Sequence, residues 1–322
     1  MRILVTGGAG FIGSSVVSEL LRLEHSVVVL DDLSTGNREN IKQLISQKNF
    51  EFVQGSILDE KLVDQLIDRV DSCFHFAAAL GVSQILERPL ESLKTNISGT
   101  EIVLEAAFRR GLPTLLASTS EIYGKNTLMP LNEESDRVLG SPDKTRWSYS
   151  EAKAIDETIA FVLHRKSDWD VKILRFFNTV GPGQNSTYGM VIPNFCKSAI
   201  RGEPLRIYGT GQQTRVFCHV ADATSAVIKV WQSNALSGKA VNIGGTQEIS
   251  VAALASMIIE ISGSNSKLEF IPYDSLNKVG FEDIERRVPD ITRIKTLTNW
   301  SPKYSLEQIL MECIERARSN ER

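Results

Sequence analysis

The segment Thr6–Gly13 (TGGAGFIG) constrains the fold of this chain more than any other stretch. It follows directly on an apolar run, Arg2–Thr6 (RILVT), which is typical of a buried strand, and it opens a helical pattern. Gly7 permits a tight turn, Gly10 lets the backbone approach a pyrophosphate, and Gly13 allows the helix to pack closely on the strand. The first amides of the helix are suited to hold phosphates. The segment therefore predicts a dinucleotide-binding strand–turn–helix unit.

Two carboxylates, Asp31 and Asp32, follow at the end of the next β-branched run, and Asp31 stands eighteen residues beyond Gly13. A carboxylate at this position accepts hydrogen bonds from both ribose hydroxyls of a dinucleotide and repels a 2′-phosphate. No arginine follows immediately, so the sequence predicts NAD rather than NADP as the cofactor. A simple loop-entry role for Asp31 is the alternative.

Short β-branched runs alternate with helical patterns through the first half of the chain. This alternation is typical of α/β proteins in which a doubly wound parallel sheet, the Rossmann arrangement, carries helices on both faces. We therefore expect an NAD-binding domain over residues 1–176. Its predicted strands are 2–6, 26–31, 50–53, 73–76, 114–118 and 171–175, and its predicted helices are 11–24, 59–69, 89–111 and 149–166.

The pattern changes after residue 176, where loops such as Gly181–Asn185 and Tyr208–Gln212 interrupt shorter elements. A chain of 322 residues also exceeds the usual size of one hydrophobic core. The sequence therefore predicts a smaller C-terminal α/β lobe over residues 177–322 that binds the substrate, with some of its segments returning to the sheet. Helices are expected over 191–201, 221–233, 250–262 and 305–317.

Charge and cysteine usage narrow the class of function. The net charge is −3, without a Lys/Arg-rich run, so we expect no nucleic-acid partner. The four cysteines and four histidines are dispersed, so we expect no metal site, and redox chemistry requires an organic cofactor. No apolar run approaches the roughly 18 residues of a membrane span. The N-terminus lacks the layout of a signal peptide, so a cytoplasmic protein without membrane contact is expected.

A tyrosine and a lysine, Tyr149 and Lys153, stand four residues apart and share one face of a predicted helix. A free tyrosine, with a pKa of about 10, is a poor base at neutral pH. A neighbouring ammonium favours the phenolate, and NAD⁺ adds further positive charge. Closing about three pKa units requires roughly 4 kcal/mol, which a partly desolvated pair can supply. The pair is a candidate proton-transfer site, and a surface Tyr/Lys pair is the alternative.

With these motifs the chain resembles, from end to end, the extended short-chain dehydrogenase/reductase family of NAD-dependent nucleotide-sugar epimerases, dehydratases and decarboxylases. The resemblance rests on the glycine motif, on Asp31, on the Tyr149/Lys153 pair, and on further motifs in the same order. These are His75–Ala78 (HFAA), Asn96, Ser118–Gly124 (STSEIYG), Arg175–Asn178 (RFFN), Gly181-Pro182, Tyr208-Gly209, Arg215 with Asp222, and Asn242–Gly244 (NIG).

The resemblance implies a role for each matching residue. Tyr149 would deprotonate the sugar 4-hydroxyl, aided by Thr119, while hydride leaves C4 for NAD⁺ and Lys153 holds the nicotinamide ribose. Asn178 and Arg215 would hold the diphosphate. The family often has an Asp that accepts from adenine where this chain has Ser56. Cofactor contacts are expected from Gly7, Gly10, Phe11, Ile12, Gly13, Asp31, Asp32, Ser34, Gly36, Ser56, Ile57, Phe76, Ala77, Ala78, Asn96, Ser118, Tyr149 and Lys153, and substrate contacts from Asn178, Val191, Pro193, Tyr208, Arg215 and Arg287.

Three reactions can follow oxidation at C4: return of hydride to the other face, loss of water, or loss of CO₂ from a C6 carboxylate. Glu121, two residues beyond Thr119, resembles the Thr-Ser-Glu of GDP-mannose 4,6-dehydratases and UDP-glucuronate decarboxylases. Arg287 matches an arginine that such decarboxylases bring into the sugar site, and Arg146–Tyr149 (RWSY) resembles another of their motifs. In the alternative interpretation, Arg287 pairs with the diphosphate and Glu121 caps a loop.

The sequence therefore favours a UDP-glucuronate decarboxylase. A UDP-sugar 4-epimerase is the second alternative and an NDP-hexose 4,6-dehydratase the third. The motifs leave the nucleotide and the sugar open. A non-enzymatic, NAD-sensing regulator is disfavoured because Tyr149, Lys153 and Thr119 are all retained. Relatives are often dimers joined through helices at roughly 95–110 and 149–166, so the resemblance implies a homodimer.

Overall fold

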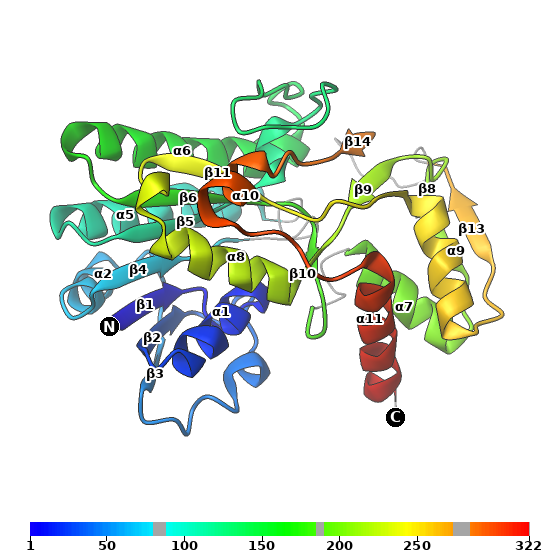
Figure 1. Ribbon diagram of the computed structural model, residues 1–322, viewed down its shortest axis with the longest axis horizontal. Coiled ribbons are helices and arrows are strands. Elements are labelled where there is room, and N and C mark those ends of the chain that lie inside the picture. Colours follow the sequence, from blue (N-terminus) through cyan, green and yellow to red (C-terminus); the bar gives the residue numbers. More distant parts are fainter. Residues whose placement is uncertain (80–87, 185–189, 273–283, 322) are drawn as a thin grey trace.

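A seven-stranded parallel sheet forms the centre of the protein (Figure 1). The computed structural model describes residues 1–79, 88–184, 190–272 and 284–321. The strand order is β11-β6-β5-β4-β1-β2-β3, and every neighbouring pair is parallel. The doubly wound sheet predicted from the sequence is thereby confirmed. The strands are β1 (Arg2–Thr6), β2 (Ser26–Asp31), β3 (Phe50–Gln54), β4 (Ser72–His75), β5 (Thr114–Thr119), β6 (Val171–Phe176) and β11 (Lys239–Ile243).

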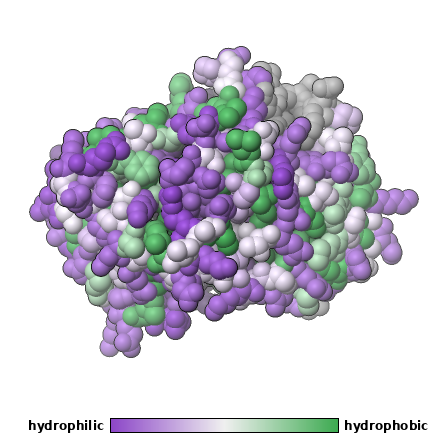
Figure 2. Space-filling view, turned by 45° about the horizontal axis from the view of Figure 1, so that its top comes forward, coloured by the Kyte–Doolittle hydropathy of each residue, from purple (hydrophilic) through white to green (hydrophobic). Residues whose placement is uncertain are grey.

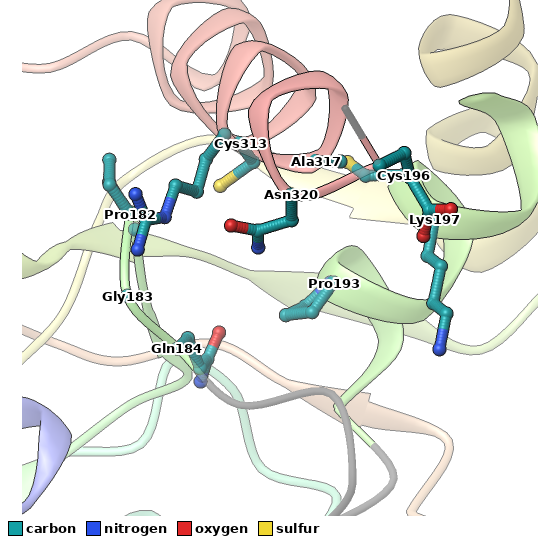
Figure 3. Close-up of a pocket in the computed structure, with 12 residues that line it drawn as sticks. Pro182, Gly183, Gln184, Pro193, Cys196, Lys197, Cys313, Ala317 and Asn320 are labelled. Atoms are coloured by element: carbon teal, nitrogen blue, oxygen red, sulfur yellow. The ribbon is translucent and has the colours of Figure 1, made fainter. Parts of the chain in front are cut away.

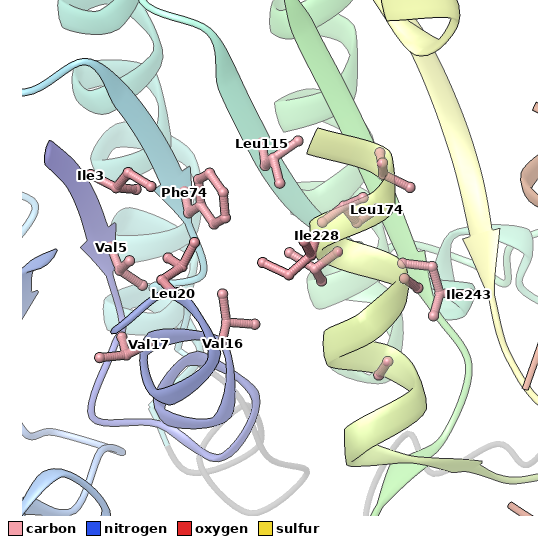
Figure 4. Packing of buried hydrophobic residues seen from close by; sticks show 14 of the residues in the cluster. Ile3, Val5, Val16, Val17, Leu20, Phe74, Leu115, Leu174, Ile228 and Ile243 are labelled. Atoms are coloured by element: carbon pink, nitrogen blue, oxygen red, sulfur yellow. The ribbon is translucent and has the colours of Figure 1, made fainter. Parts of the chain in front are cut away.

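Helices cover both faces of this sheet, which explains why its strands are apolar almost throughout. In Figure 4, Val5 of β1 lies among side chains of the helix that follows it, such as Leu20, and Leu174 of β6 lies near Ile228. One face carries α1 (Phe11–Arg22), α8 (Val220–Gln232) and α10 (Thr292–Thr298), and the other carries α2 (Glu60–Ile67), α5 (Thr100–Arg109) and α6 (Ser148–Ser167). The shorter helices are η1 (Arg38–Ile41), α4 (Pro89–Lys94), η2 (Thr95–Gly99), η3 (Ser120–Tyr123), η4 (Thr145–Trp147) and η6 (Asn234–Leu236).

A smaller lobe lies beside the sheet, at the right of Figure 1, and has a hydrophobic core of its own. Strand β13 pairs with β8, and β9 lies between β12 and β14. A short parallel pair, β7 with β10, is found where the chain passes between the two parts. The elements after β6 are β7 (Thr179–Val180), α7 (Val191–Arg201), β8 (Leu205–Tyr208), β9 (Thr214–Val216), β10 (Cys218–His219), β12 (Glu248–Ser250), α9 (Val251–Ser262), β13 (Leu268–Ile271), β14 (Arg286–Arg287) and α11 (Leu306–Asn320).

The path of the chain joins the lobe and the sheet several times. After β6 the chain builds α7, β8 and β9, then returns to the sheet for α8 and β11. It leaves again for β12, α9, β13 and β14, returns for α10, and ends in α11. The cleft between the two parts is therefore lined by segments that are far apart in the sequence.

Long periodic segments were predicted more accurately than short ones. The predicted helix 191–201 coincides with α7, and the predicted helix 89–111 is divided into α4, η2 and α5. The strands β8, β9, β12, β13 and β14 were not predicted individually. They have two to four residues each, too few for a period of two to stand out from a loop.

Hydrophilic and hydrophobic side chains are distributed unevenly over the surface. On the face seen in Figure 2, hydrophilic residues predominate and hydrophobic ones gather only in small groups. Among the helices of the described residues, none combines the length and the apolar character needed to cross a bilayer.

Arg175, on β6, joins several segments inside the core. Its guanidinium donates to both carboxylate oxygens of Glu157 on α6, at 3.0 and 2.7 Å. It also donates to the Tyr123 hydroxyl at 2.9 Å and to the Glu133 carbonyl at 2.8 Å. The Tyr123 hydroxyl in turn donates to Asn242 of β11 at 2.8 Å. Arg175 is only 7% exposed, and burial of its charge is tolerated because these partners satisfy its donors.

Replacing Arg175 by Met should lower the free energy of unfolding by about 3–5 kcal/mol, because Glu157 would stay buried without its counter-charge. Urea unfolding followed by circular dichroism measures the change. The matched control is Arg206→Ala, which breaks an exposed pair with Glu269 and should cost less than about 1 kcal/mol. Equal losses in the two variants would contradict the importance of the buried pair.

Candidate active site

A cleft of about 790 Å³ lies between the sheet and the smaller lobe. It opens at the carboxyl ends of the strands, where the order reverses between β1 and β4, which is the usual ligand site of an open α/β sheet. Most predicted site residues line it, so the fold brings them together. They are Gly7, Gly10, Phe11, Ile12, Gly13, Asp31, Asp32, Ser34, Ile57, Phe76, Ala77, Ala78, Ser118, Thr119, Glu121, Tyr149, Lys153, Asn178, Val191, Pro193, Arg215 and Arg287.

The glycine loop is packed too closely for side chains at two positions. A Cβ on Gly13 would lie 2.2 Å from the Gly7 carbonyl oxygen, and one on Gly7 would lie 2.5 Å from the Ala77 amide nitrogen. Gly7 also has a φ of +71°, which favours glycine. Gly10 is the N-cap of α1 and supplies no side-chain cap, and Phe11 of the first turn lines the cleft. The uncapped amides of this turn fit the pyrophosphate of NAD.

Asp31 lies at the end of β2 and lines the same cleft. Its Oδ2 accepts from the Ala9 amide at 2.9 Å, and its Oδ1 accepts from the Leu33 amide at 2.8 Å. Burial raises the pKa of Asp31, while these two hydrogen bonds act in the opposite direction. Each carboxylate oxygen keeps a second lone pair, so the group fits the ribose hydroxyls of NAD.

Four predicted residues lie outside the lining of this cleft. Asn96 is fully buried, and its side chain exchanges hydrogen bonds with the backbone of Ala79 at 2.7 and 3.1 Å, so it holds the segment after β4. The Ser56 hydroxyl accepts from a backbone amide two residues further on. Gly36 packs beside a carboxylate oxygen of Asp31. Tyr208 is 41% exposed at the end of β8. Ligand contacts of these four residues stay predictions.

Tyr149 and Lys153 line the cleft one turn apart on α6, but Lys153 does not act on Tyr149 as a free cation. The Lys153 ammonium is 2% exposed and is paired with the Asp156 carboxylate at 3.0 Å. Burial raises the pKa of Tyr149, and the negative charges of Glu121 and Asp156 raise it further. Asp156 compensates much of the Lys153 charge, so the expected acidification of the phenol by Lys153 and NAD⁺ together stays a prediction. Bound NAD⁺ would add positive charge to this site.

Glu121 lies between two arginines from distant parts of the chain. Arg287 of β14 donates to its Oε1 at 2.5 Å, and Arg146 of η4 forms an ion pair with its Oε2 at 2.5 Å. Burial alone would raise the pKa of Glu121, but the Arg287 and Arg146 guanidiniums outweigh burial and lower it to about 2. The two arginines therefore favour the carboxylate form of Glu121 at neutral pH. The Nε of Arg287 is buried without a hydrogen-bond partner among the described residues.

Thr119 and Ser118, at the end of β5, differ in how their hydroxyls are used. The Thr119 hydroxyl accepts from the Glu121 amide at 3.2 Å and so begins η3 at the edge of the cleft. The Ser118 hydroxyl donates to Glu157 at 2.5 Å. The Ser118 hydroxyl is therefore engaged by the core network, whereas the Thr119 hydroxyl is bonded to the backbone of Glu121 at the cleft.

The smaller lobe contributes the residues expected to hold the diphosphate. Asn178 donates from its side-chain amide to the Val216 carbonyl at 2.8 Å. Arg215 of β9 donates to the preceding carbonyl at 2.8 Å. Val191 and Pro193 belong to the first turn of α7 and line the cleft beside them. These side chains face a common space, and their contact with a diphosphate stays a prediction.

Several residues of the site escaped the sequence analysis. Arg146 was noted only as part of a motif, although it stands three residues before Tyr149 at the start of a helix. Arg316 and Asn320 of α11 line the cleft, and no motif marks them. They also line a neighbouring cavity of about 180 Å³, where Figure 3 shows Asn320 pointing toward the space between Pro182 and Pro193. The lobe therefore adds polar groups from its last helix.

Replacing Gly13 by Ala should abolish NAD binding, because its Cβ would overlap the Gly7 carbonyl that shapes the loop. Isothermal titration of the purified variant with NAD measures the loss, which we expect to exceed about 100-fold in Kd, equivalent to about 2.7 kcal/mol. Ser14→Ala, on the same turn, removes only a hydroxyl bonded to the Phe11 carbonyl and serves as the control. Unchanged NAD affinity in the Gly13 variant would contradict the assignment of the loop.

Comparison with known proteins agrees with this geometry. The family model described as the NAD dependent epimerase/dehydratase family matches residues 3–244. The chain is 38% identical to a UDP-N-acetyl-alpha-D-glucosaminuronate decarboxylase of Bacillus cytotoxicus, over 98% of this chain and 97% of that protein. It is 36% identical to UDP-glucuronic acid decarboxylase 1 of Xenopus tropicalis, over 97% of this chain and 71% of that protein.

Solved structures give the same result. Pal from Bacillus thuringiensis has a TM-score of 0.90 at 30% identity and covers 99% of this chain and 100% of its own. The UDP-glucuronic acid 4-epimerase of Bacillus cereus, solved with UDP-glucuronic acid and NAD, has a TM-score of 0.88 at 28% identity, with 99% and 100% covered. The chain described here therefore belongs to the NAD-dependent epimerase/dehydratase family of enzymes.

Proposed function

We propose that this enzyme decarboxylates a UDP-linked uronic acid, with UDP-glucuronate as the first candidate substrate. The observation that carries the proposal is the cluster formed by Arg287, Arg146 and Glu121 in the cleft that also holds Tyr149. Two guanidiniums at one carboxylate leave a net positive charge at this place in the cleft. A sugar with a C6 carboxylate matches this charge, whereas a neutral hydroxymethyl group does not require it.

The residues of the cleft fit the proton transfers of such a reaction. Bound NAD supplies a hydride acceptor and donor for C4. Tyr149 takes the proton of the 4-hydroxyl, and Thr119 forms a hydrogen bond to the same oxygen. With a carbonyl at C4, the C5–C6 bond breaks, CO₂ leaves, and its electron pair passes to C5 and the C4 oxygen. A proton taken up from solvent is then added to C5, and Tyr149 returns its proton when C4 is reduced. Asn178 and Arg215 hold the diphosphate throughout.

Glu121 contributes through its charge. The pKa of Glu121, about 2, keeps this residue ionised. Glu121 therefore repels the C6 carboxylate of the substrate, whereas Arg287 and Arg146 attract that carboxylate. Loss of CO₂ moves the negative charge of the substrate from the C6 carboxylate to C5 and the C4 oxygen, and so relieves the repulsion at C6. An interaction that is less favourable to the ground state than to the decarboxylating state accelerates the step. Glu121 thereby weakens the hold of the two arginines on the ground-state carboxylate.

A UDP-sugar 4-epimerase is the second candidate. Tyr149 and Thr119 suffice for it, because the same C4 carbonyl can receive hydride on its other face. The similarity to the epimerase from Bacillus cereus, whose substrate is also a uronic acid, supports this reading. The relatives of highest identity named above are decarboxylases, and for this reason we place decarboxylation first.

Incubation with NAD and UDP-glucuronate, UDP-N-acetylglucosaminuronate or UDP-glucose, followed by mass spectrometry, tests the proposal. We expect a product that has lost CO₂ from one of the uronates and no such product from UDP-glucose. A product of unchanged mass with inverted C4 would establish the epimerase instead. Arg287→Ala should lower the decarboxylation rate by about 100-fold or more, whereas its neighbour Arg286→Ala, which breaks only an exposed pair with Glu248, should change it little.

We further propose a homodimer in the cytoplasm without nucleic-acid or membrane partners. Ile155 and Val162 of α6 are 43% and 39% exposed and stand two turns apart on one face. An apolar stripe of this kind suits the packing of a helix from a second copy. All four cysteines are free and buried, in keeping with a reducing compartment.

Light scattering should give the mass of two chains for the wild type. Ile155→Asp should yield monomers, because it would bury a charge in the helix interface. Met311→Asp on α11, at a comparably exposed site (47%), is the control and should stay dimeric. A monomeric wild type would contradict the proposed dimer.

A further inference from the structure

A buried carboxylate on α6 has no part in the chemistry described so far. Asp156 is fully buried, and its Oδ2 accepts from the Lys153 ammonium at 3.0 Å. Its Oδ1 has no hydrogen-bond partner in the part of the chain that the structure describes. A carboxylate retained in the core with one oxygen unpaired is costly unless its charge has a use. The use must concern Lys153, because this is the cation that it contacts.

The other hydrogen-bond partner of Asp156 is uncharged, and besides burial the negative charge of Glu157 next to it is a further influence, which raises the pKa of Asp156. Its Oδ2 also accepts from the Thr100 hydroxyl at 3.3 Å, and that hydroxyl lies 3.0 Å from Nε2 of His75. The Nδ1 of His75 lies 2.6 Å from the hydroxyl of Thr6, the residue before the glycine loop. Burial, and then the charge of Lys153, lower the pKa of His75 to about 3, so this imidazole is neutral. This series of hydrogen bonds through Thr100 and His75 therefore positions Asp156 relative to β1, and it adds no charge.

We propose that Asp156 is a positioning residue for proton transfer, which keeps the proton of the Tyr149/Lys153 couple on Lys153 and thereby keeps the phenolate as the reactive form. The inference rests on the proposed function only in taking Tyr149 as the base. Glu157, the next residue on α6, is already engaged by Arg175, and Glu121 is engaged by Arg146 and Arg287. Asp156 is thus the carboxylate that acts on Lys153 directly.

Two opposite effects follow when the couple loses one proton. The negative charge of Asp156 makes that loss harder, in agreement with its contribution to the raised pKa of Tyr149. The same charge favours the arrangement with phenolate and ammonium over the one with phenol and neutral amine, because only the ammonium forms an ion pair with Asp156. Interacting groups of this kind titrate as a pair. Asp156 therefore raises the pH at which the Tyr149/Lys153 couple loses its proton. Above that pH, it increases the fraction of molecules in which Tyr149 is the phenolate and Lys153 the ammonium.

The isosteric variant Asp156→Asn separates these effects from a structural role. It keeps an acceptor for Lys153 and Thr100 and removes one negative charge. We expect the acid limb of the pH profile of kcat to move to lower pH by on the order of one unit, and the plateau to fall severalfold. A purely structural role would lower stability and the plateau and leave the limb in place. An unmoved acid limb would overturn the inference.

Asp168→Asn is the matched control, because it removes a carboxylate at the exposed C-terminal end of the same helix, where Asn tolerates the positive φ of 53°. It should leave the acid limb unchanged. Tyrosinate absorbance of the NAD-loaded protein, corrected with Tyr149→Phe versions, gives a readout independent of turnover. If the absorbance of the Tyr149 phenolate rises at lower pH in Asp156→Asn than in the wild type, the inference is supported. If it rises at the same pH in both, the inference is overturned. If the wild type turns over none of the uronates, the proposed function is rejected. The absorbance measurement then still decides the inference about Asp156, because it does not depend on turnover.

Discussion

The ion pair between Arg175 and Glu157 is the interaction on which the arrangement of the site depends. It connects the sixth strand to the helix that carries Tyr149 and Lys153, and Tyr123 extends it to the loop that carries Glu121. Because the network is buried and satisfied, these groups are fixed relative to the sheet without contact to a ligand. The side chains that we propose as catalytic are thus fixed by contacts in the core, and they line the cleft on the opposite side.

Charge compensation is the common feature of the catalytic groups. The cations that line the centre of the cleft do not stand alone: Lys153 is paired with Asp156, and Arg287 shares Glu121 with Arg146. Such pairing lowers the cost of burying ions in the absence of ligand. A ligand charge that enters the cleft meets a neutral pair at Lys153 and Asp156 and one net positive charge at Glu121 and its two arginines. Small additions of charge, such as an oxidised nicotinamide or a carboxylate, can then shift a proton.

Sequence reasoning succeeded where the physics is local. The parallel strands follow from β-branched runs, the cofactor loop from glycine spacing, and the Tyr149/Lys153 face from helical periodicity. The ion pairs of the site are not local, since Glu121 and Arg287 are 166 residues apart and were associated only through the family resemblance. Asp156 resembled any other helical residue until its burial was known. The pKa of Tyr149 also depends on Glu121 and Asp156, which the spacing of Tyr149 and Lys153 along the helix could not reveal.

The repeated passage of the chain between sheet and lobe bears on how new specificities arise in such an architecture. The lobe is assembled from several separate insertions between elements that also build the sheet, and its final helix follows one that packs on the sheet. The lobe is therefore not one continuous segment that could be exchanged as a unit. Diversification toward other sugars must therefore proceed by exchanging individual side chains and loops along the cleft, while the hydride-transfer machinery beneath is inherited intact.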